Sequence, residues 1–129
     1  MPNANWIKKT RGFSLIELMV ITAIISILMA IAIPNYISYR NKAYCSQAEN
    51  DANNVKGAIA GYFGVPSHFA LPDISDLKIN VNNPVEISGD SNTTITIIVT
   101  DRSGKCPKDY QNAMEGWDAA NNQFTKYID

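Results

Sequence analysis

Few residues in this 129-residue sequence have the spacing that catalysis would need. His68 is the only histidine, and it follows Pro66 in a segment typical of a loop, which favours a structural or solvated role. No nucleophile–base pair, phosphate-binding loop or HExxH motif occurs in the sequence. The only cysteines, Cys45 and Cys106, do not form a CxxC motif. The sequence therefore predicts no enzyme, no metal site and no cofactor.

One acidic residue lies where a charge is costly. Glu17 interrupts the apolar run 13–33, which reads FSLIELMVITAIISILMAIAI. A helix over this run would be about 31 Å long, which matches the hydrocarbon core of a bilayer at about 30 Å. A carboxylate in hydrocarbon usually has a partner and a function. The alternative is that Glu17 extends to the membrane interface without a further role.

The residues before the apolar run set its orientation. Lys8, Lys9 and Arg11 are expected to stay in the cytoplasm, which places the C-terminal part of the chain outside. A secretory signal peptide is an alternative, but its apolar core usually has about 7–15 residues, fewer than this run has. The formal net charge is −1, and without Lys8, Lys9 and Arg11 the chain has 8 basic and 12 acidic residues, or −4. This balance argues mildly against a nucleic-acid partner, for which a basic surface would be expected.

The junction between the basic and apolar segments carries a motif. The segment Arg11–Met19, RGFSLIELM, resembles the processing motif of type IV prepilins and of type II secretion pseudopilins. The resemblance implies a basic leader over residues 1–12, cleavage between Gly12 and Phe13 by a prepilin peptidase, and N-methylation of Phe13 by the same enzyme. It also implies that Glu17 pairs with the N-terminal amine of a neighbouring subunit, which would set the register of a filament.

A single long helix is expected over residues 13–63. Pro34 lies inside it and predicts a kink, because proline removes a helical hydrogen bond. Ser26 stands where many pilins have a glycine, and it makes local melting of the helix less favourable. One apolar face is formed by Val55, Ile59, Tyr62 and Phe63. The opposite face is mostly filled by Gln47, Glu49, Asn50, Asp51, Asn53, Asn54 and Lys56.

An aromatic cluster of Tyr36, Tyr39 and Tyr44 follows the apolar run. Its spacing resembles that of the short pilins of metal-reducing bacteria, for which electron conduction along aromatic residues has been proposed. Interfacial anchoring and packing between helices is the favoured interpretation, because aromatic rings suit both tasks. Electron transfer remains the alternative.

Residues 64–129 are expected to form a small antiparallel sheet packed on the apolar face of the helix. The fold class is therefore predicted to be α+β and pilin-like. The β-branched run Thr93–Thr100 predicts a strand, preceded by a turn at Gly89–Asn92. Shorter elements are expected as strands at Leu77–Val81, Val85–Ser88 and Gln123–Ile128, and as a short helix or loop over 108–116.

The two cysteines are predicted to pair. Cys45 lies on the expected helix outside the cytoplasm and Cys106 lies in the C-terminal part, where an oxidising compartment favours a disulfide. A bridge over this separation stabilises a domain by about 4 kcal/mol in a chain-entropy model. Many pilins instead bridge two C-terminal cysteines, and two free thiols remain the alternative.

Calcium is a further alternative, since loop aspartates bind it in some pseudopilins. Asp73 with Asp76, or Asp101 with Asp109, are the candidate residues. The sequence lacks the spacing of an EF-hand, so solvated loop charge is favoured.

The resemblance implies a structural subunit of a type IV pilus. It would rest in the lipid bilayer of the inner membrane, bind an assembly platform there and self-associate into a surface filament. Adhesion, motility, DNA uptake or contact with surfaces are the tasks of such filaments. A pseudopilin of a periplasmic type II secretion system and a minor pilin are the alternatives within the family. A membrane-anchored domain that binds a ligand through residues 64–129 is the alternative outside it.

Overall fold

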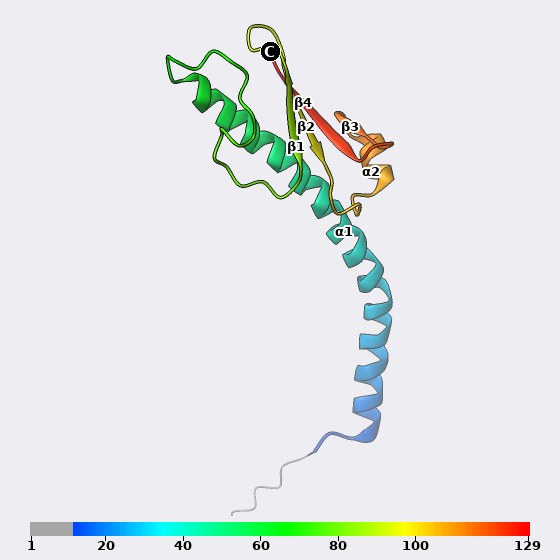
Figure 1. Cartoon of the computed structure of the whole chain (residues 1–129). Coiled ribbons are helices and arrows are strands. Elements are labelled where there is room, and N and C mark those ends of the chain that lie inside the picture. The colour runs from blue at the N-terminus through cyan, green and yellow to red at the C-terminus, as the bar shows by residue number, and fades with distance from the viewer. Residues whose placement is uncertain (1–11) are drawn as a thin grey trace, which may run out of the picture. The chain divides into compact units, whose positions relative to one another are not determined.

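The computed structural model describes residues 12–129 (Figure 1). Apart from Gly12, the leader predicted over residues 1–12 lies outside the described residues. The chain divides into two compact units, one ending at Tyr36 and the other spanning Ile37–Asp129.

The long helix α1 spans Leu15–Phe63 and contains Pro34. The helix continues past this proline, and the kink expected there stays a prediction. The helix ends where the Gly64 backbone N–H donates to the Ala60 carbonyl oxygen at 3.2 Å. Pro66 follows two residues later and cannot donate a helical hydrogen bond.

The second unit buries one face of α1. Cys45, Ala48, Ala52, Val55 and Ile59 are almost completely buried, at intervals of three and four residues that match the helical period. The predicted apolar face continues through the half-buried side chains of Tyr62 and Phe63. One residue assigned to the polar face differs, because Asp51 is only 2% exposed.

The buried face of α1 packs against an antiparallel sheet with the strand order β1-β2-β4-β3 (Figure 1). The strands are β1 (Val85–Gly89), β2 (Ile95–Thr100), β3 (Trp117–Asp118) and β4 (Gln123–Ile128). In β2, the buried side chains of Ile95, Ile97 and Val99 alternate with half-buried ones, as a strand with one face on the core requires. The predicted α+β fold is therefore confirmed.

The segment Leu77–Val81 is not a strand, and the prediction for it was wrong. Leu77, Ile79 and Val81 are half-buried and pack against the core, so their alternation in sequence reflects burial alone. Lys78 has a φ angle of 49°, a left-handed conformation that interrupts extended backbone.

Three details of the C-terminal elements differ from or add to the sequence-based expectations. The segment 108–116 contains a short helix, α2 (Lys108–Ala113). The two-residue strand β3 follows it, and the sequence analysis did not predict this strand. Strand β2 begins at Ile95 because Thr93 and Thr94 belong to the preceding turn.

Candidate functional site

The first turn of α1 is closed by reciprocal hydrogen bonds between Ser14 and Glu17. The Ser14 backbone N–H donates to Glu17 Oε2 at 3.0 Å, and the Glu17 backbone N–H donates to Ser14 Oγ at 3.2 Å. This arrangement is a capping box, which satisfies amide groups that a helix N-terminus leaves unpaired. The Ser-x-x-Glu spacing before an apolar run is visible in the sequence, and the sequence-based interpretation of Glu17 overlooked it.

Glu17 lies beside an apolar groove. The groove is lined by Phe13, Ile16, Val20 and Ile21 together with Glu17 itself, and the Phe13 side chain is 83% exposed. A carboxylate has about four acceptor sites, and the Ser14 N–H occupies one. The group therefore keeps acceptor capacity toward a cation on another molecule. The helix N-terminus also favours a negative charge at this place.

The segment around this site exposes apolar side chains throughout. All residues from Gly12 to Arg40 are exposed, and α1 is long and apolar enough to cross a membrane by length and composition. Two hydroxyl groups within the segment, those of Thr22 and Ser26, donate to carbonyl oxygens of the same helix. Thr22 Oγ1 donates to the Leu18 carbonyl oxygen at 3.0 Å, and Ser26 Oγ donates to the Thr22 carbonyl oxygen at 2.7 Å. These bonds lower the cost of placing the hydroxyl groups in an apolar environment.

The three tyrosines of the predicted aromatic cluster have different surroundings. Tyr36 and Tyr39 are 69% and 81% exposed, whereas Tyr44 is half-buried. The Lys105 ammonium lies 5.2 Å from the centre of the Tyr44 ring. The pKa of Tyr44 is lowered mainly by a hydrogen bond from Lys105 and by the charge of Lys105, and to a smaller extent by Arg40. The role of these tyrosines in a filament stays a prediction.

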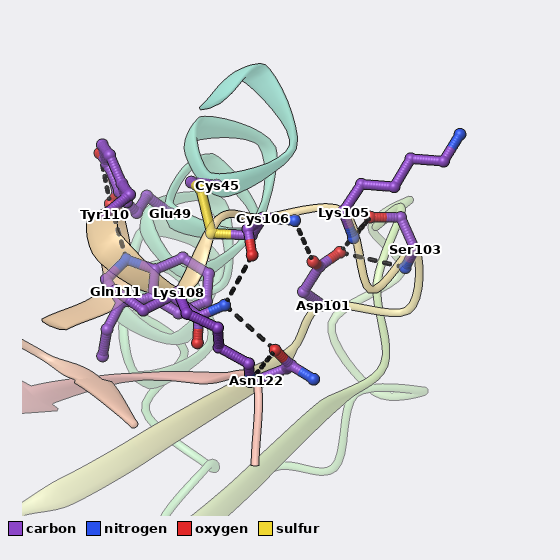
Figure 2. The surroundings of a disulfide bond; sticks show 11 residues. Cys45, Glu49, Asp101, Ser103, Lys105, Cys106, Lys108, Tyr110, Gln111 and Asn122 are labelled. Carbon is purple, nitrogen blue, oxygen red and sulfur yellow. Dashed lines mark hydrogen bonds between the residues drawn. A yellow bond between two sulfur atoms is a disulfide. The ribbon is translucent and has the colours of Figure 1, made fainter. Parts of the chain in front are cut away.

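The predicted disulfide is confirmed: Cys45 on α1 is bonded to Cys106 (Figure 2). The two residues are 0% and 3% exposed. Neighbouring side chains hold the backbone of Cys106 from both sides. The Cys106 N–H donates to Asp101 Oδ2 at 3.1 Å, and Gln111 Nε2 donates to the Cys106 carbonyl oxygen at 3.0 Å. The bridge therefore ties the β2–α2 connection to the helix.

A second link between α1 and the C-terminal part is made by Glu49. Its Oε1 accepts hydrogen bonds from Tyr110 Oη at 3.0 Å and from Trp117 Nε1 at 2.9 Å. Burial, and then the hydrogen bond to Glu49, raise the pKa of Tyr110. Glu49 was assigned to the polar face of the helix. Its partners lie more than 60 residues away, and no local sequence pattern predicts them.

Asp51 forms the third link. Its carboxylate accepts hydrogen bonds from the backbone N–H groups of Asn82 and Asn83 and from Asn83 Nδ2, at 2.9–3.3 Å. Asn83 Oδ1 in turn accepts from the Arg102 backbone N–H at 3.2 Å. A buried carboxylate is tolerated when several donors surround it, which explains why Asp51 lies inside.

His68 and the loop aspartates have structural contacts. His68 Nδ1 lies 2.9 Å from the Tyr62 carbonyl oxygen, and its ring stacks on the Tyr62 ring with centroids 4.0 Å apart. Asp76 Oδ2 accepts from the Asp73 backbone N–H, and Asp101 binds the backbone beside the disulfide. Within residues 12–129, no group of three or more His, Cys, Asp or Glu side chains is placed to hold a metal ion.

Comparisons with known proteins agree with the N-terminal motif. The family model described as the prokaryotic N-terminal methylation motif matches residues 7–33. The fimbrial protein EcpC of Eikenella corrodens is 35% identical over 136 aligned residues, which cover 92% of this chain and 87% of that protein.

Two further relatives match a smaller share of the chain. The type IV major pilin protein PilA of Myxococcus xanthus is 39% identical over 48% of this chain and 28% of that protein. The type IV major pilin protein PilE1 of Neisseria gonorrhoeae is 43% identical over 61% of this chain and 47% of that protein. No solved structure gives a significant match. The extent of the match to EcpC and the methylation motif together show that the chain belongs to the type IV pilin family.

Proposed function

We propose that the chain is the precursor of a type IV pilus subunit, which is cut once and assembled through its N-terminal helix. A prepilin peptidase hydrolyses the peptide bond between Gly12 and Phe13, and the new amine of Phe13 is methylated. The precursor thus has a leader over 1–12 that is removed, and the processed chain has a helix over 13–63 and a C-terminal globular part over 64–129.

The surroundings of Gly12 support cleavage at this bond. Gly12 is exposed, and a Cβ atom added to it would meet no atom within 4 Å. The fold therefore does not require glycine here. A requirement for glycine would come from the peptidase, whose site must accept the residue before the cut.

The observation that carries the proposal is the position of Glu17 in an apolar groove beside Phe13. Cleavage leaves a positive amine on Phe13, and a second copy can present this amine to the Glu17 carboxylate. A charge buried without a partner is unfavourable, so the pair is retained only when two subunits lie in the correct register. Apolar contacts alone would allow the helices of two subunits to slide along each other, and the pair with Glu17 selects one register.

The exposed apolar segment is suited to two successive environments, the lipid bilayer and the filament. The segment from Leu15 to Ile33 lies in the inner-membrane bilayer before assembly, and packs against the same segment of other subunits afterwards. An inner-membrane assembly platform transfers the subunit between these environments. The C-terminal part remains outside throughout, and the subunit acts by structure without catalysing a reaction.

Mass spectrometry of sheared surface filaments and of the membrane fraction tests this function. We expect the filaments to contain an abundant chain that begins at N-methylated Phe13. The same processed chain confined to the membrane fraction would instead indicate a pseudopilin or a minor pilin. A chain that keeps residues 1–12 in both fractions would contradict the proposal and favour a membrane-anchored binding domain.

A further inference from the structure

The turn between β1 and β2 carries a sequence that the pilin function does not use. It reads Asp90-Ser91-Asn92-Thr93-Thr94, and Asn92-Thr93-Thr94 matches the Asn-x-Ser/Thr acceptor sequence for asparagine-linked glycosylation. Asn92 is the only asparagine in the whole sequence that is followed two positions later by serine or threonine.

The fold presents this asparagine at the surface. Asn92 and Thr93 are exposed at the tip of the turn, as a modified side chain must be. The turn is closed behind them, because the Asp90 N–H donates to the Thr94 carbonyl oxygen and the Thr93 N–H donates to the Asp90 carbonyl oxygen, both at 3.1 Å. An enzyme can therefore reach the tip without opening the sheet.

Among residues 12–129, the hydrogen-bond partner of the Asn92 side-chain amide lies in its own turn. Asn92 Nδ2 donates to Asp90 Oδ1 at 3.3 Å, a long hydrogen bond between exposed groups. The Thr94 hydroxyl, the other group that defines the acceptor sequence, donates to Asp129 Oδ1 at 3.2 Å near the chain end. Both bonds are exposed to water, so exchanging them for bonds to an enzyme costs little.

Asp90 adds a negative charge two residues before Asn92. A carboxylate at this distance gives a transferase with a basic binding site a second point of contact. The combination of Asp90, Asn92 and Thr94 within one exposed turn is more specific than the three-residue sequence alone.

We propose that Asn92 is an acceptor for asparagine-linked glycosylation by a membrane-bound transferase that uses a polyprenyl-pyrophosphate-linked oligosaccharide. Asn92 Nδ2 bonds to the anomeric carbon of the first sugar, and the bond from that carbon to the pyrophosphate oxygen breaks. The amide proton goes to a base of the transferase, and polyprenyl pyrophosphate leaves. This inference rests on the proposed function, which places residues 64–129 on the outer side of the membrane.

The position of the turn gives the sugar a physical role. Ser91 Oγ donates to the Phe69 carbonyl oxygen at 3.1 Å, and the Phe69 side chain is 80% exposed. An oligosaccharide on Asn92 is attached next to Ser91, which contacts the Phe69 backbone. It would cover part of the surface around this turn and reduce its contact with other molecules.

The test uses the full chain in a bacterium that contains such a transferase, its lipid-linked oligosaccharide and a control acceptor protein. Trypsin releases the segment Ile79–Arg102, which contains Asn92. We expect its mass to increase by that of the oligosaccharide. Asn92→Gln and Thr94→Ala should abolish the increase, and Asp90→Asn should reduce it. Thr93→Ala is the matched control, because it changes the same turn but keeps the acceptor sequence.

Unmodified Ile79–Arg102 from chains that begin at Phe13, alongside a glycosylated control acceptor, would overturn this inference and leave the proposed pilin processing intact. Equal modification of Thr94→Ala and Thr93→Ala would also overturn it, because the acceptor sequence would then not be recognised. Chains that retain residues 1–12 but carry the sugar on Asn92 would support the inference and contradict the proposed cleavage.

Discussion

Ser14 and Glu17 exchange hydrogen bonds across the first turn of α1, so the carboxylate has a task within its own chain before any second subunit is considered. The capping box starts the helix next to the proposed cleavage site. The same carboxylate lies in an apolar groove with Phe13, where it can accept a neighbour's amine. Capping requires only a side-chain oxygen at this position, whereas pairing with an amine requires a negative charge, so the two tasks can be separated by substitution.

The first prediction concerns Glu17→Gln. Glutamine preserves the capping box, because its side-chain oxygen can still accept the Ser14 N–H, but it removes the charge. We expect processed subunits in the membrane and a loss of filaments, since the neighbouring amine would be buried without a counter-charge. Electron microscopy and immunoblotting of sheared filaments measure this result.

Ser14→Ala is the control for that prediction. It removes one half of the capping box, at a cost of about 1 kcal/mol to the helix terminus, and keeps the Glu17 charge. Filaments should persist. Equal loss of filaments in Ser14→Ala and Glu17→Gln would mean that Glu17 acts through capping and not through a pair between subunits.

Removing the disulfide should destabilise the C-terminal part. The bridge joins Cys45 and Cys106 across 61 positions, and replacing both by alanine should lower the free energy of unfolding by about 4 kcal/mol in the chain-entropy model. Chemical denaturation of the processed chain in detergent, followed by Trp117 fluorescence, measures the change. The native chain under reducing conditions should show a comparable loss, and equal stability of both forms would contradict the prediction.

Local sequence patterns predicted most of the fold. The buried face of α1 follows from the helical period, and β2 and β4 follow from runs of β-branched and aromatic residues. The turn before β2 follows from Gly89–Asn92. These signals lie within the elements themselves, so a single sequence was sufficient to find them.

The contacts that attach the sheet to the helix could not be predicted in this way. Asp51 and Glu49 have polar side chains on a helix, which normally indicates exposure. Their partners Asn83, Tyr110 and Trp117 lie 32, 61 and 68 positions away. The strand predicted at Leu77–Val81 was wrong because the sequence does not show which distant residues a segment contacts. The apolar side chains of this segment pack on the core, but its backbone pairs with no strand.

Glu49 should contribute more to stability than an ordinary surface carboxylate. Glu49→Ala leaves the hydroxyl of Tyr110 and the indole N–H of Trp117 without their acceptor, and should destabilise the domain by about 2–3 kcal/mol. Tyr110→Phe removes one of the two hydrogen bonds and should cost about 1 kcal/mol. Denaturation measurements that show equal, small effects for both variants would argue against Glu49 as a link.

The raised pKa of Tyr110 gives a prediction for alkaline conditions. The folded state retains the Tyr110 proton more strongly than the unfolded state, so this contribution to stability is fully present below the unfolded-state pKa of about 10. It should be lost as pH rises through the higher pKa of the folded state. The difference in stability between the native chain and Tyr110→Phe should therefore shrink at alkaline pH. If the stability difference between the native chain and Tyr110→Phe instead grew as pH rose above about 10, the pKa of Tyr110 would not be raised in the folded state.

Two glycines should respond to alanine in opposite directions. Gly89 has a φ angle of 109°, and a Cβ atom added there would overlap the Thr94 carbonyl oxygen, so Gly89→Ala must distort the β1–β2 turn. Such a change should cost more than about 1 kcal/mol. Gly57 lies in α1, and a Cβ atom added there would meet nothing within 4 Å, so Gly57→Ala should stabilise the helix by about 0.5–1 kcal/mol. Unfolding in detergent measures both, and a neutral Gly89→Ala variant would show that the turn accepts another backbone conformation.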